Sequence, residues 1–458
     1  MEVFVKHYLL TDFGGIGDGS FDNSASFAQA FGELKEGDSL AIGKGVWKTG
    51  PLTLRAKNVE IVLEAGSRIV FSDDEELYEP VFSRWEGVNC YCMHPCFYIV
   101  DSENIRISGS GVIDGNGQKW WTTSAYKREF QTEPVTKQEK QLALLNPGYQ
   151  TQSGGGGGRQ SQFLRPPLVQ IHNSDKVTME GISLENSPFW TLHPLYSKNI
   201  TFKELSIVNP KDAPNTDGMD IDSCEHVTIS ECFLDVGDDG IALKSGSGLD
   251  GIETNRPTKD VTILQCTVRN AHGGAVIGSE TAAGIHNIEV SDCLFDGTDR
   301  GIRIKTRRGR GGAISNLLFS GIMMENNVCP LTINMYYRCG SFHEEDFSLK
   351  KLPLEPTTPS IHDVIIRNCR ATGITSTAGF IVGLPESPIT NLSIEDCDFA
   401  LAVRGLVGVS ESEMYSGLED AKGRGIRLRN VHLQINHLKI TGVKKDLLIE
   451  EGAKLNEA

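Results

Sequence analysis

The sequence lacks the features that would place the protein in a membrane or on a nucleic acid. No apolar run approaches the roughly 18 residues that a membrane-spanning helix needs, so no span is predicted in these 458 residues. Positive charge is in deficit, because 44 lysines and arginines face 60 aspartates and glutamates and leave a formal net charge of −16. Nucleic acids and anionic membrane surfaces repel such a chain, and we expect neither as a partner.

The beginning of the chain lacks the marks of export. Residues Met1 to His7 show no positively charged start, no apolar stretch and no small-residue cleavage site, which are the parts of a secretory signal peptide. We therefore expect the chain as given to be cytoplasmic.

Cysteine motifs for metal binding are also missing. No Cys-x-x-Cys occurs, and the cysteines and histidines are scattered, which argues against a zinc site. The eleven cysteines are an odd number, and disulfides would be one interpretation in a secreted protein. Some of them, however, follow the first apolar residue of a repeated pattern at one constant offset: Cys232, Cys266, Cys293, Cys369 and Cys397. The constant offset predicts a buried column of reduced thiols, which behave as small apolar side chains. A disulfide or a metal site is the less favoured alternative.

A repeat with the two-residue alternation of β-strands runs through most of the chain. Each copy has a polar residue followed by apolar and polar residues in turn, and clear copies begin at Asn199, His226, Asp260, Asn287, Asp363 and Asn391. From Val177 to Leu317 the first apolar residues are 23, 27, 34, 27 and 29 residues apart. This variable period, without the fixed ladder of leucine-rich repeats and shorter than a propeller blade, predicts a β-solenoid. The expected fold is all-β, a right-handed parallel β-helix.

The repeat argues for one domain over residues 1–458. Each coil of a β-helix buries its apolar face only against neighbouring coils, so a continuous core needs them all. A short helix from Asp22 to Phe31, capped by one of its first residues, is predicted to cover the open end.

Two segments break the repeat and are predicted as loop excursions beside the coils. The first covers about 123–165, and the second about 338–358. The first contains a helix-like run from Thr136 to Leu145 and the glycine-rich run Ser153–Gly158.

Four short polar motifs follow one another along the repeat. They are Asn215-Thr216-Asp217-Gly218, Gly237-Asp238-Asp239-Gly240, Ala271-His272-Gly273-Gly274 and Arg303-Ile304-Lys305. Asp-Gly and Asn-Thr-Asp-Gly alone are typical of ordinary turns, and a lone histidine is more often structural than catalytic. When the coils are aligned on Gly218, Gly240, Gly274 and Gly301, Asp217 falls in the column of Asp239, and Asp238 falls in the column of His272. The four motifs are therefore predicted to form one site.

Strand alternation after the glycines predicts which side chains point outward. The first and third residues after each glycine are apolar and are expected inside, so the second and fourth should lie on one exposed face. That face would carry Asp220, Asp222, Lys244, Arg303 and Lys305.

This set of side chains indicates acid/base chemistry on an anionic sugar. Three carboxylates one or two coils apart cannot all ionise independently, so one is expected to hold a proton near neutral pH. Glycosidic cleavage uses a protonated acid beside an ionised base. Cations next to them would bind a substrate carboxylate. The run Arg303, Lys305, Arg307, Arg308 and Arg310 in an acidic chain favours a binding site over a solvated face.

With these four motifs in this order, the chain resembles glycoside hydrolase family 28, the polygalacturonase family, over nearly its whole length. The segments Asp12 to Gly19, Gly115 to Trp121, Leu164 to Pro167 and Ser187 to Pro194 resemble its bacterial exo-acting branch. The resemblance implies hydrolysis of α-linked galacturonic acid residues with inversion, exo-cleavage of pectin-derived oligogalacturonides, and no metal or cofactor.

The resemblance also implies a role for each candidate residue. Asp238 matches the general acid, Asp217 and Asp239 match the residues that hold and deprotonate water, and His272 matches the histidine that supports the acid. Arg303 and Lys305 match the binders of the galacturonate carboxylate. The remaining matches are substrate contacts at Asn215 and Asp220 and a tyrosine beside the cleaved bond at Tyr337. Ala271 and Gly240 depart from the usual family residues, which puts substrate preference in doubt.

Other functions stay open at this point. A hydrolase of the same family could act on rhamnogalacturonan or xylogalacturonan, which also present a carboxylate. A β-helical pectate lyase would need a calcium site of several carboxylates. A non-catalytic carbohydrate-binding β-helix would need no aligned Asp, His and Arg columns.

Overall fold

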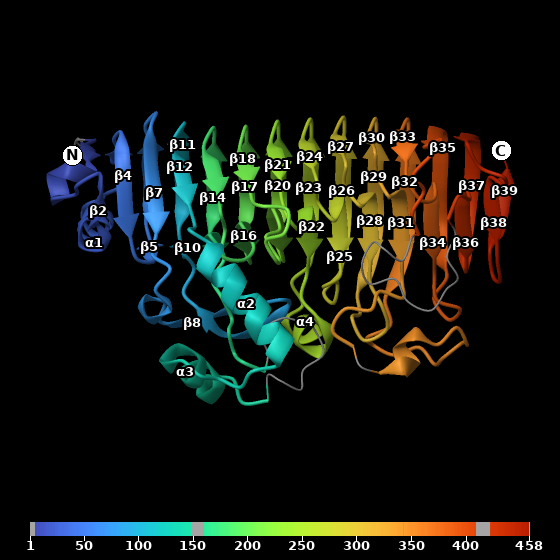
Figure 1. The fold of residues 1–458 in the computed structure, drawn as a ribbon, viewed down its shortest axis with the longest axis horizontal. Coiled ribbons are helices and arrows are strands. Elements are labelled where there is room, and N and C mark those ends of the chain that lie inside the picture. Colours follow the sequence, from blue (N-terminus) through green and yellow to red (C-terminus); the bar gives the residue numbers. More distant parts are fainter. Residues whose placement is uncertain (1–4, 149–159, 342, 409–421, 458) are drawn as a thin grey trace. The chain divides into compact units, whose positions relative to one another are not determined.

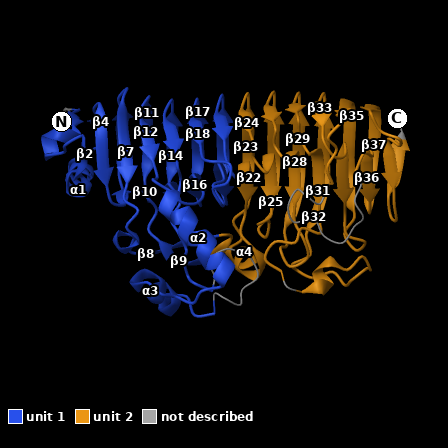
Figure 2. Cartoon of the chain, viewed as in Figure 1, with its two compact units in different colours: residues 1–85, 89–152, 157–237 blue, residues 86–88, 153–156, 238–458 orange. Residues whose placement is uncertain are grey.

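The computed structural model describes residues 5–148, 160–341, 343–408 and 422–457. Contacts divide the chain into two compact units (Figure 2). Unit 1 comprises Met1–Trp85, Asn89–Gln152 and Gly157–Gly237, and unit 2 comprises Glu86–Val88, Ser153–Gly156 and Asp238–Ala458. Each unit is a stack of coils with parallel strand pairing, which confirms the predicted all-β class. The single domain over 1–458 stays a prediction.

In unit 1, equivalent strands of successive coils pair in parallel and form three rows. Within a row, successive strands lie side by side, as Figure 1 shows. The first row contains β1 (His7–Leu9), β3 (Ser39–Ile42), β6 (Lys57–Leu63), β11 (Glu103–Gly109), β14 (Asp175–Glu180), β17 (Lys198–Lys203) and β20 (Glu225–Ser230). The second row contains β2 (Asp18–Asp22), β4 (Gly45–Thr49), β7 (Ser67–Phe71), β12 (Val112–Asp114), β15 (Ser183–Glu185), β18 (Ser206–Val208) and β21 (Phe233–Asp235). The third row contains β5 (Leu52–Leu54), β10 (Phe97–Val100), β13 (Val169–His172), β16 (Leu192–Leu195) and β19 (Met219–Asp222).

Unit 2 has the same three rows. The first contains β23 (Thr258–Leu264), β26 (Ile285–Ser291), β29 (Ala313–Ser320), β32 (Ser360–Arg367), β35 (Ile389–Leu401), β37 (Val431–Thr441) and β39 (Lys454–Glu457). The second contains β24 (Thr267–Arg269), β27 (Leu294–Asp296), β30 (Met323–Glu325) and β33 (Arg370–Ile374). β33 pairs in parallel with the long strand β35. The third contains β22 (Asp239–Lys244), β25 (Gly273–Gly278), β28 (Arg300–Lys305), β31 (Cys329–Asn334), β34 (Gly379–Val382), β36 (Ile426–Arg429) and β38 (Leu447–Ile449).

The predicted register of the repeat is confirmed within each unit. In unit 1, Val177 pairs with Ile200, and Ile200 pairs with Val227. In unit 2 the same column contains Val261, Ile288, Leu317, Val364 and Leu392. All of these side chains are buried. The apolar alternation therefore sets the register, because a slip by one residue would move every buried side chain to the outside.

The polar residue that opens each repeat has a structural reason. Asp260, Asn287 and Asn316 have φ angles of 56°, 59° and 54°, in the left-handed region. Asn and Asp tolerate this conformation better than other non-glycine residues. Their side chains also bond from coil to coil, since Asn287 Nδ2 donates to Asp260 Oδ1 at 2.9 Å and Asn316 Nδ2 donates to Asn287 Oδ1 at 2.7 Å.

The predicted cysteine column is confirmed. All eleven cysteines lie among the described residues and are thiols, and only Cys339 among them is not fully buried. In unit 2, Cys266 Sγ donates to Leu264 O at 3.3 Å and Cys293 Sγ donates to Ser291 O at 3.2 Å. Each thiol in the column thus bonds the carbonyl two residues before it, inside the core.

The N-terminal helix forms close to the predicted place. α1 spans Ser24–Glu33 with Asn23 at its N-cap position. Phe27, Ala30 and Phe31 on its inner face are buried. The Phe31 ring stacks on Phe97 of β10 with centroids 6.0 Å apart, so the helix packs on the first coils of unit 1, as Figure 1 shows.

The first excursion is more helical than predicted. α2 (Gln118–Phe130) begins before the predicted start, and α3 (Lys137–Leu145) matches the helix-like run. α3 begins with a capping box, in which Thr136 Oγ1 accepts from Glu139 N and the Glu139 carboxylate accepts from Thr136 N. The glycine-rich run Ser153–Gly158 lies outside the described residues. A two-stranded arm, β8 (Pro80–Trp85) and β9 (Val88–Met93), projects from the coils as well.

In the described part of the second excursion, residues 338–341 and 343–358, there is a short 3₁₀ turn, η4 (Glu344–Phe347). A further short helix, α4 (Gly248–Thr254), follows β22. Other 3₁₀ turns span Leu10–Phe13 and Glu75–Leu77. Among the described residues, no helix combines the length and the apolar character needed to cross a bilayer.

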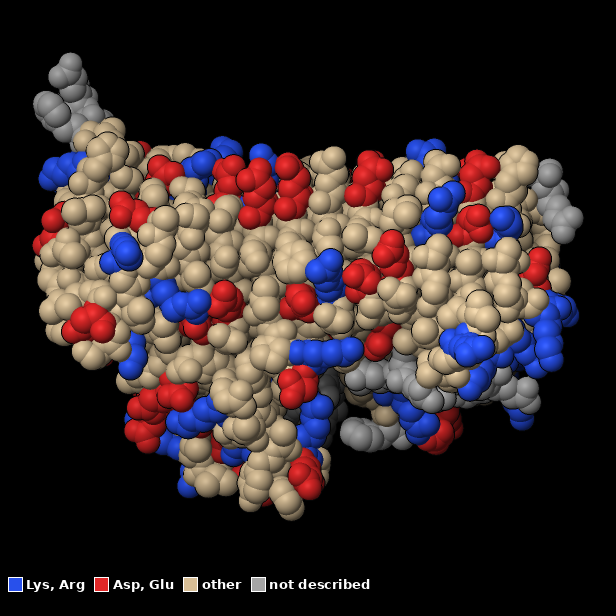
Figure 3. Space-filling view, turned by 45° about the horizontal axis from the view of Figure 1, so that its top comes forward, with Lys and Arg blue, Asp and Glu red and all other residues tan. Residues whose placement is uncertain are grey.

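Basic and acidic side chains are intermixed on the face shown in Figure 3. Exposed ion pairs occur in unit 1, where Arg106 contacts Glu60 at 3.0 Å and Glu180 at 2.8 Å. These exposed pairs add little to stability, because water and salt screen them.

Candidate active site

The third row of unit 2 aligns three of the predicted motifs. Asp239 of β22 pairs with Gly273 of β25, which pairs with Arg300 of β28. The neighbouring positions therefore bring Gly240, Gly274 and Gly301 into one column, as predicted. A side chain would not fit there, since a Cβ on Gly274 would lie 2.4 Å from the Phe295 ring and one on Gly301 would lie 2.3 Å from the Met324 sulfur. Glycine thus keeps the strand close to the interior while the outer face carries the polar groups.

Asp239 is held by two cations from the next coils. Arg303 Nη1 donates to Asp239 Oδ1 at 2.8 Å, and Lys305 Nζ donates to Asp239 Oδ2 at 2.5 Å. Burial alone would raise the pKa of Asp239, but the charges of Lys305, Arg303 and Lys244 outweigh it and hold the pKa well below the ordinary range. Asp239 is therefore ionised at any ordinary pH.

Asp238 forms a second pair, with His272. His272 Nδ1 lies 3.2 Å from Asp238 Oδ1, and both side chains are about one fifth exposed, at 22% and 20%. The backbones also connect, since His272 N donates to Asp238 O at 2.9 Å. This is the accessible part of the cluster, where a substrate oxygen can reach a carboxyl group.

Neither Asp238 nor Asp239 is the carboxyl group that was predicted to hold a proton near neutral pH. Burial raises the pKa of Asp238, but His272 and then Lys305 more than compensate and leave the pKa below its ordinary value. The prediction rested on the mutual repulsion of the carboxylates, but Asp239 is paired with Arg303 and Lys305, and Asp238 is stabilised by His272 and Lys305. Without a substrate, Asp238 is an ionised carboxylate beside an imidazole.

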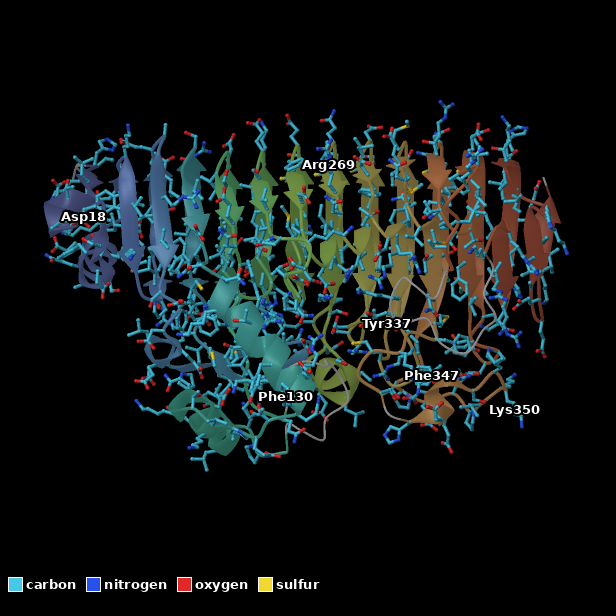
Figure 4. The ribbon with its side chains drawn as sticks, in the orientation of Figure 1. Asp18, Phe130, Arg269, Tyr337, Phe347 and Lys350 are labelled. Carbon is cyan, nitrogen blue, oxygen red and sulfur yellow. The ribbon has the colours of Figure 1, made fainter. Side chains whose placement is uncertain are left out.

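Tyr337 lies over the same cations. Its ring centroid is 5.1 Å from Lys305 Nζ and 5.6 Å from the Arg303 guanidinium carbon. Burial raises the pKa of Tyr337 well above the ordinary value, so its hydroxyl keeps its proton. Figure 4 shows the residue where the chain leaves the strands of unit 2 for the second excursion. Tyr337 thus belongs to the same cluster as Arg303 and Lys305.

The outer face is not exposed, which corrects the prediction from strand alternation. Lys244, Arg303 and Lys305 are only 3%, 5% and 5% exposed. The side chains do leave the strands on the outer side, but the connections between the strands fold over them. For Lys244 the cover is Glu280, whose Oε2 accepts from Lys244 Nζ at 3.1 Å.

Glu280 is a residue that sequence reasoning missed. It lies 3.6 Å from Arg310 Nη1 as well as bonding Lys244. Burial raises its pKa, but Lys244 and Arg310 lower it to about 2. Its position just after β25, opposite two cations, was the available signal. Lys244 is therefore paired inside the protein.

The last described coil of unit 1 carries the other predicted residues. Asp217 and Asp220 are buried at 3% and 0% exposure, and Asp217 O accepts from Thr191 N at 2.9 Å. Asn215 has a left-handed φ of 53°. Its Oδ1 accepts from Arg165 Nη2 at 3.0 Å and from Arg128 Nη2 of α2 at 3.1 Å. The two arginines were not predicted as site residues.

Asp222, predicted on the exposed face, is a buried structural group. Its Oδ1 accepts from Arg84 Nη1 of the β8–β9 arm at 2.7 Å, and neither side chain is exposed. Burial raises its pKa, but Arg84 and then His193 lower it to about 2. The ion pair attaches the arm to the coils of unit 1.

Unit 2 thus brings together Asp238, Asp239, His272, Arg303, Lys305 and Tyr337, while Asn215, Asp217 and Asp220 lie in the final coil of unit 1. A carboxyl–imidazole pair that is about one fifth exposed, beside a carboxylate held by two cations, can transfer a proton and bind an anion.

Comparisons with known proteins agree with this chemistry. The model of glycosyl hydrolases family 28 matches residues 148–403. A probable polygalacturonase of Vitis vinifera is 28% identical over 86% of this chain and 74% of its own length. The exopolygalacturonase of Thermotoga maritima has a TM-score of 0.79 at 28% identity and covers 96% of this chain and 93% of its own. The polygalacturonase of Erwinia carotovora, 19% identical with a TM-score of 0.65 and coverage of 100% and 98%, shares the fold.

The fold and the cluster define a glycoside hydrolase built on a right-handed parallel β-helix, as predicted. Since the family model matches more than half of the chain, the protein belongs to glycosyl hydrolases family 28.

Proposed function

We propose that the protein hydrolyses galacturonan with inversion and removes galacturonic acid units from the ends of short pectin-derived chains. The observation that carries the proposal is the cluster in unit 2, where the Asp238–His272 pair lies next to Asp239 with its two cations. Polygalacturonases are the named relatives, and the similar structure at 28% identity is an exopolygalacturonase.

Asp238 is the general acid in this proposal. It is the more exposed of the two adjacent aspartates, so its carboxyl group can approach a glycosidic oxygen. Its pKa is low in the absence of ligand because His272 and Lys305 stabilise the ionised form. A bound uronate brings a negative charge to the cations and displaces water, and both effects raise the pKa of a nearby carboxyl group. Substrate binding would therefore place the proton on the acid when it is needed.

Asp239 is the residue that holds the attacking water in this proposal. Asp239, held between Arg303 and Lys305, is too weak a base to take a proton but accepts a hydrogen bond in a constant position. We assign the removal of the water proton to Asp217. Inversion follows when water attacks from the face opposite the leaving oxygen.

Arg303 and Lys305 bind the uronate carboxylate. Lys305 has three ammonium hydrogens, of which one is on Asp239. A guanidinium likewise has five donors in a planar fork. Both cations can therefore hold Asp239 and a ligand carboxylate together. Asn215, Asp220 and the protonated Tyr337 hydroxyl are proposed as further substrate contacts.

The exo mode is supported by the first excursion. Arg128 of α2 reaches Asn215, a proposed substrate contact, so helical structure borders that residue. Helical structure beside a substrate contact suits the binding of a chain end better than the binding of a polymer that extends past the site in both directions. The Dickeya chrysanthemi exo-poly-alpha-D-galacturonosidase, 23% identical over 95% of this chain, is in line with this mode.

Product analysis tests the proposal. Polygalacturonan and defined oligogalacturonides should release monomer from the first minutes with little early loss of viscosity, and NMR should show the β-anomer first. A ladder of oligomers with a rapid fall in viscosity would overturn the exo mode alone. Retention of the anomeric configuration would refute the roles of the aspartates. Cleavage only of rhamnogalacturonan or xylogalacturonan would change the substrate.

A further inference from the structure

Arg307, Arg308 and Arg310 do not extend the cation patch that sequence reasoning predicted. They are 1%, 6% and 0% exposed, among the most deeply buried long side chains of unit 2. The guanidinium groups of Arg307 and Arg308 donate mainly to backbone carbonyls of the second excursion, residues 338–358. Arg310 donates to Cys339 O at 3.3 Å and to Ser247 Oγ at 2.8 Å. The cations of this run therefore differ in their partners: Arg303 and Lys305 contact Asp239, whereas Arg307, Arg308 and Arg310 each contact backbone carbonyls of the second excursion.

Two of the arginines meet at a single carbonyl. Cys339 O accepts from Arg307 Nε at 3.2 Å and from Arg310 Nη2 at 3.3 Å. Arg307 Nη2 also donates to Gly340 O at 3.0 Å. The planar fork of Arg307 thus holds two consecutive peptide groups at the start of the second excursion, which a lysine could not do with one point charge.

Arg308 holds the far part of the second excursion. Its Nη1 donates to Asp346 O at 3.1 Å and to Ser348 O at 2.8 Å. Its other side forms a bidentate pair with Glu386, Nε to Oε1 at 2.5 Å and Nη2 to Oε2 at 3.0 Å. Figure 4 shows Phe347 and Lys350 on this part of the loop, away from the strands.

Cys339, whose carbonyl Arg307 and Arg310 contact, lies close in sequence to Tyr337 of the candidate active site. Cys339 follows Tyr337 by two residues, and Tyr337 N donates to Thr306 O at 3.2 Å, immediately before Arg307. Tyr337 is therefore attached on both sides, to Thr306 by its own amide and to Arg307 and Arg310 through Cys339. These attachments keep its ring over Lys305 and Arg303.

We propose that Arg307, Arg308 and Arg310 are positioning residues that fix the second excursion and thereby set the affinity of the site for a uronate carboxylate. The inference rests on the proposed function, because it takes Arg303 and Lys305 as the carboxylate binders. With Tyr337 in place, water is kept from these cations and their attraction for an anion is stronger. When the loop is released, the ring leaves, water enters and the carboxylate binds less tightly.

The first test uses Cys339 as a reporter. It is the one cysteine that is not fully buried, whereas Cys266 lies in the core. Arg307→Lys should raise the rate of Cys339 alkylation by iodoacetamide about tenfold or more, measured by peptide mapping, with Cys266 unchanged. Arg269→Lys is the matched control, because Arg269 is about half exposed and contacts Asp296 at 3.5 Å on another row of strands (Figure 4). Equal rates of Cys339 alkylation in the two variants would overturn the proposal that Arg307 fixes the second excursion.

The second test is kinetic. In Arg307→Lys the KM for an oligogalacturonide should rise about tenfold while kcat changes less than about threefold, because a carboxylate contact made alike in ground and transition states affects KM alone. Its effect on kcat/KM should be non-additive with that of Tyr337→Ala, since both remove the same cover. Additive effects, or a loss confined to kcat, would overturn the positioning role.

The reactivity of Cys266 shows whether Arg307→Lys still folds, and a second variant is available if it does not. If Cys266 becomes reactive in Arg307→Lys, the core has opened, and Arg308→Lys is then used with the same readouts. If the wild type does not cleave galacturonan, the proposed function fails and the affinity claim fails with it. The Cys339 result then still decides whether the arginines hold the loop.

Discussion

Replacement of Glu280 by Gln should destabilise unit 2 strongly. Glu280 is 5% exposed and neutralises Lys244 and Arg310, which are 3% and 0% exposed. The variant keeps the shape and removes the charge, so two cations are left in the interior with an amide as partner. Breaking a buried pair in this way costs about 3–5 kcal/mol.

The pKa gives an independent magnitude. The pKa of Glu280 falls from 4.5 to about 2, because Lys244 and Arg310 outweigh the effect of burial. At about 1.4 kcal/mol per pKa unit this corresponds to roughly 3 kcal/mol. Since the folded pKa is depressed, this stability is fully present above about pH 4.5 and is lost as the pH falls toward 2.

Thermal unfolding at neutral pH is the assay. With about 2–4 °C per kcal/mol for 150–250 residues, Glu280→Gln should lower the Tm of the transition of unit 2 by roughly 6–20 °C. The difference from wild type should narrow between about pH 4.5 and pH 2, where the wild type loses the same charge. Glu231→Gln is the control, because Glu231 is half exposed and lies 3.9 Å from Lys203. A Tm for Glu280→Gln equal to that of the control at neutral pH would refute the reasoning.

The remaining predictions concern the site and the core. Asp238→Asn should lower kcat by about 10²–10⁴ with an unchanged circular dichroism spectrum, and near-normal turnover would rule Asp238 out as the acid. Arg303→Ala should reduce turnover of uronides far more than any activity on neutral galactosides, and an equal loss would make Arg303 structural. The pKa of Asp238 should be higher in the kcat profile than in the kcat/KM profile, because bound uronate favours its protonated form. Coincident profiles would contradict that role of the substrate. Cys266→Val should cost less than about 1.5 kcal/mol in urea unfolding, and a larger loss would show that the thiol does more than fill space.

The local part of the fold could be predicted because it repeats. Strand alternation, the polar residue before each first apolar residue and the constant cysteine offset are all periodic features, and each coil supplies the pattern again. The structure adds the reason for the polar residue, which is the left-handed backbone of residues such as Asn287. α3 was also predictable, because Thr136 and Glu139 form a capping box within one turn.

The surroundings of the site were less predictable. Glu280, Arg84 and Arg165 are partners of predicted residues, but they come from connections that follow no period. For the same reason, alternation correctly placed Lys244 and Asp222 on the outer side of their strands and wrongly expected them to be exposed.

The sequence by itself determined the β-helix, its register within each unit, the cysteine column and the order of the motifs, because these depend on interactions between equivalent residues of adjacent coils. Only the tertiary structure decided which charges neutralise which. Asp239 with Arg303 and Lys305, Asp222 with Arg84, and Arg308 with Glu386 are pairs between residues far apart in the chain. Charge pairing depends on distance and burial, and both are set by how the excursions fold over the coils.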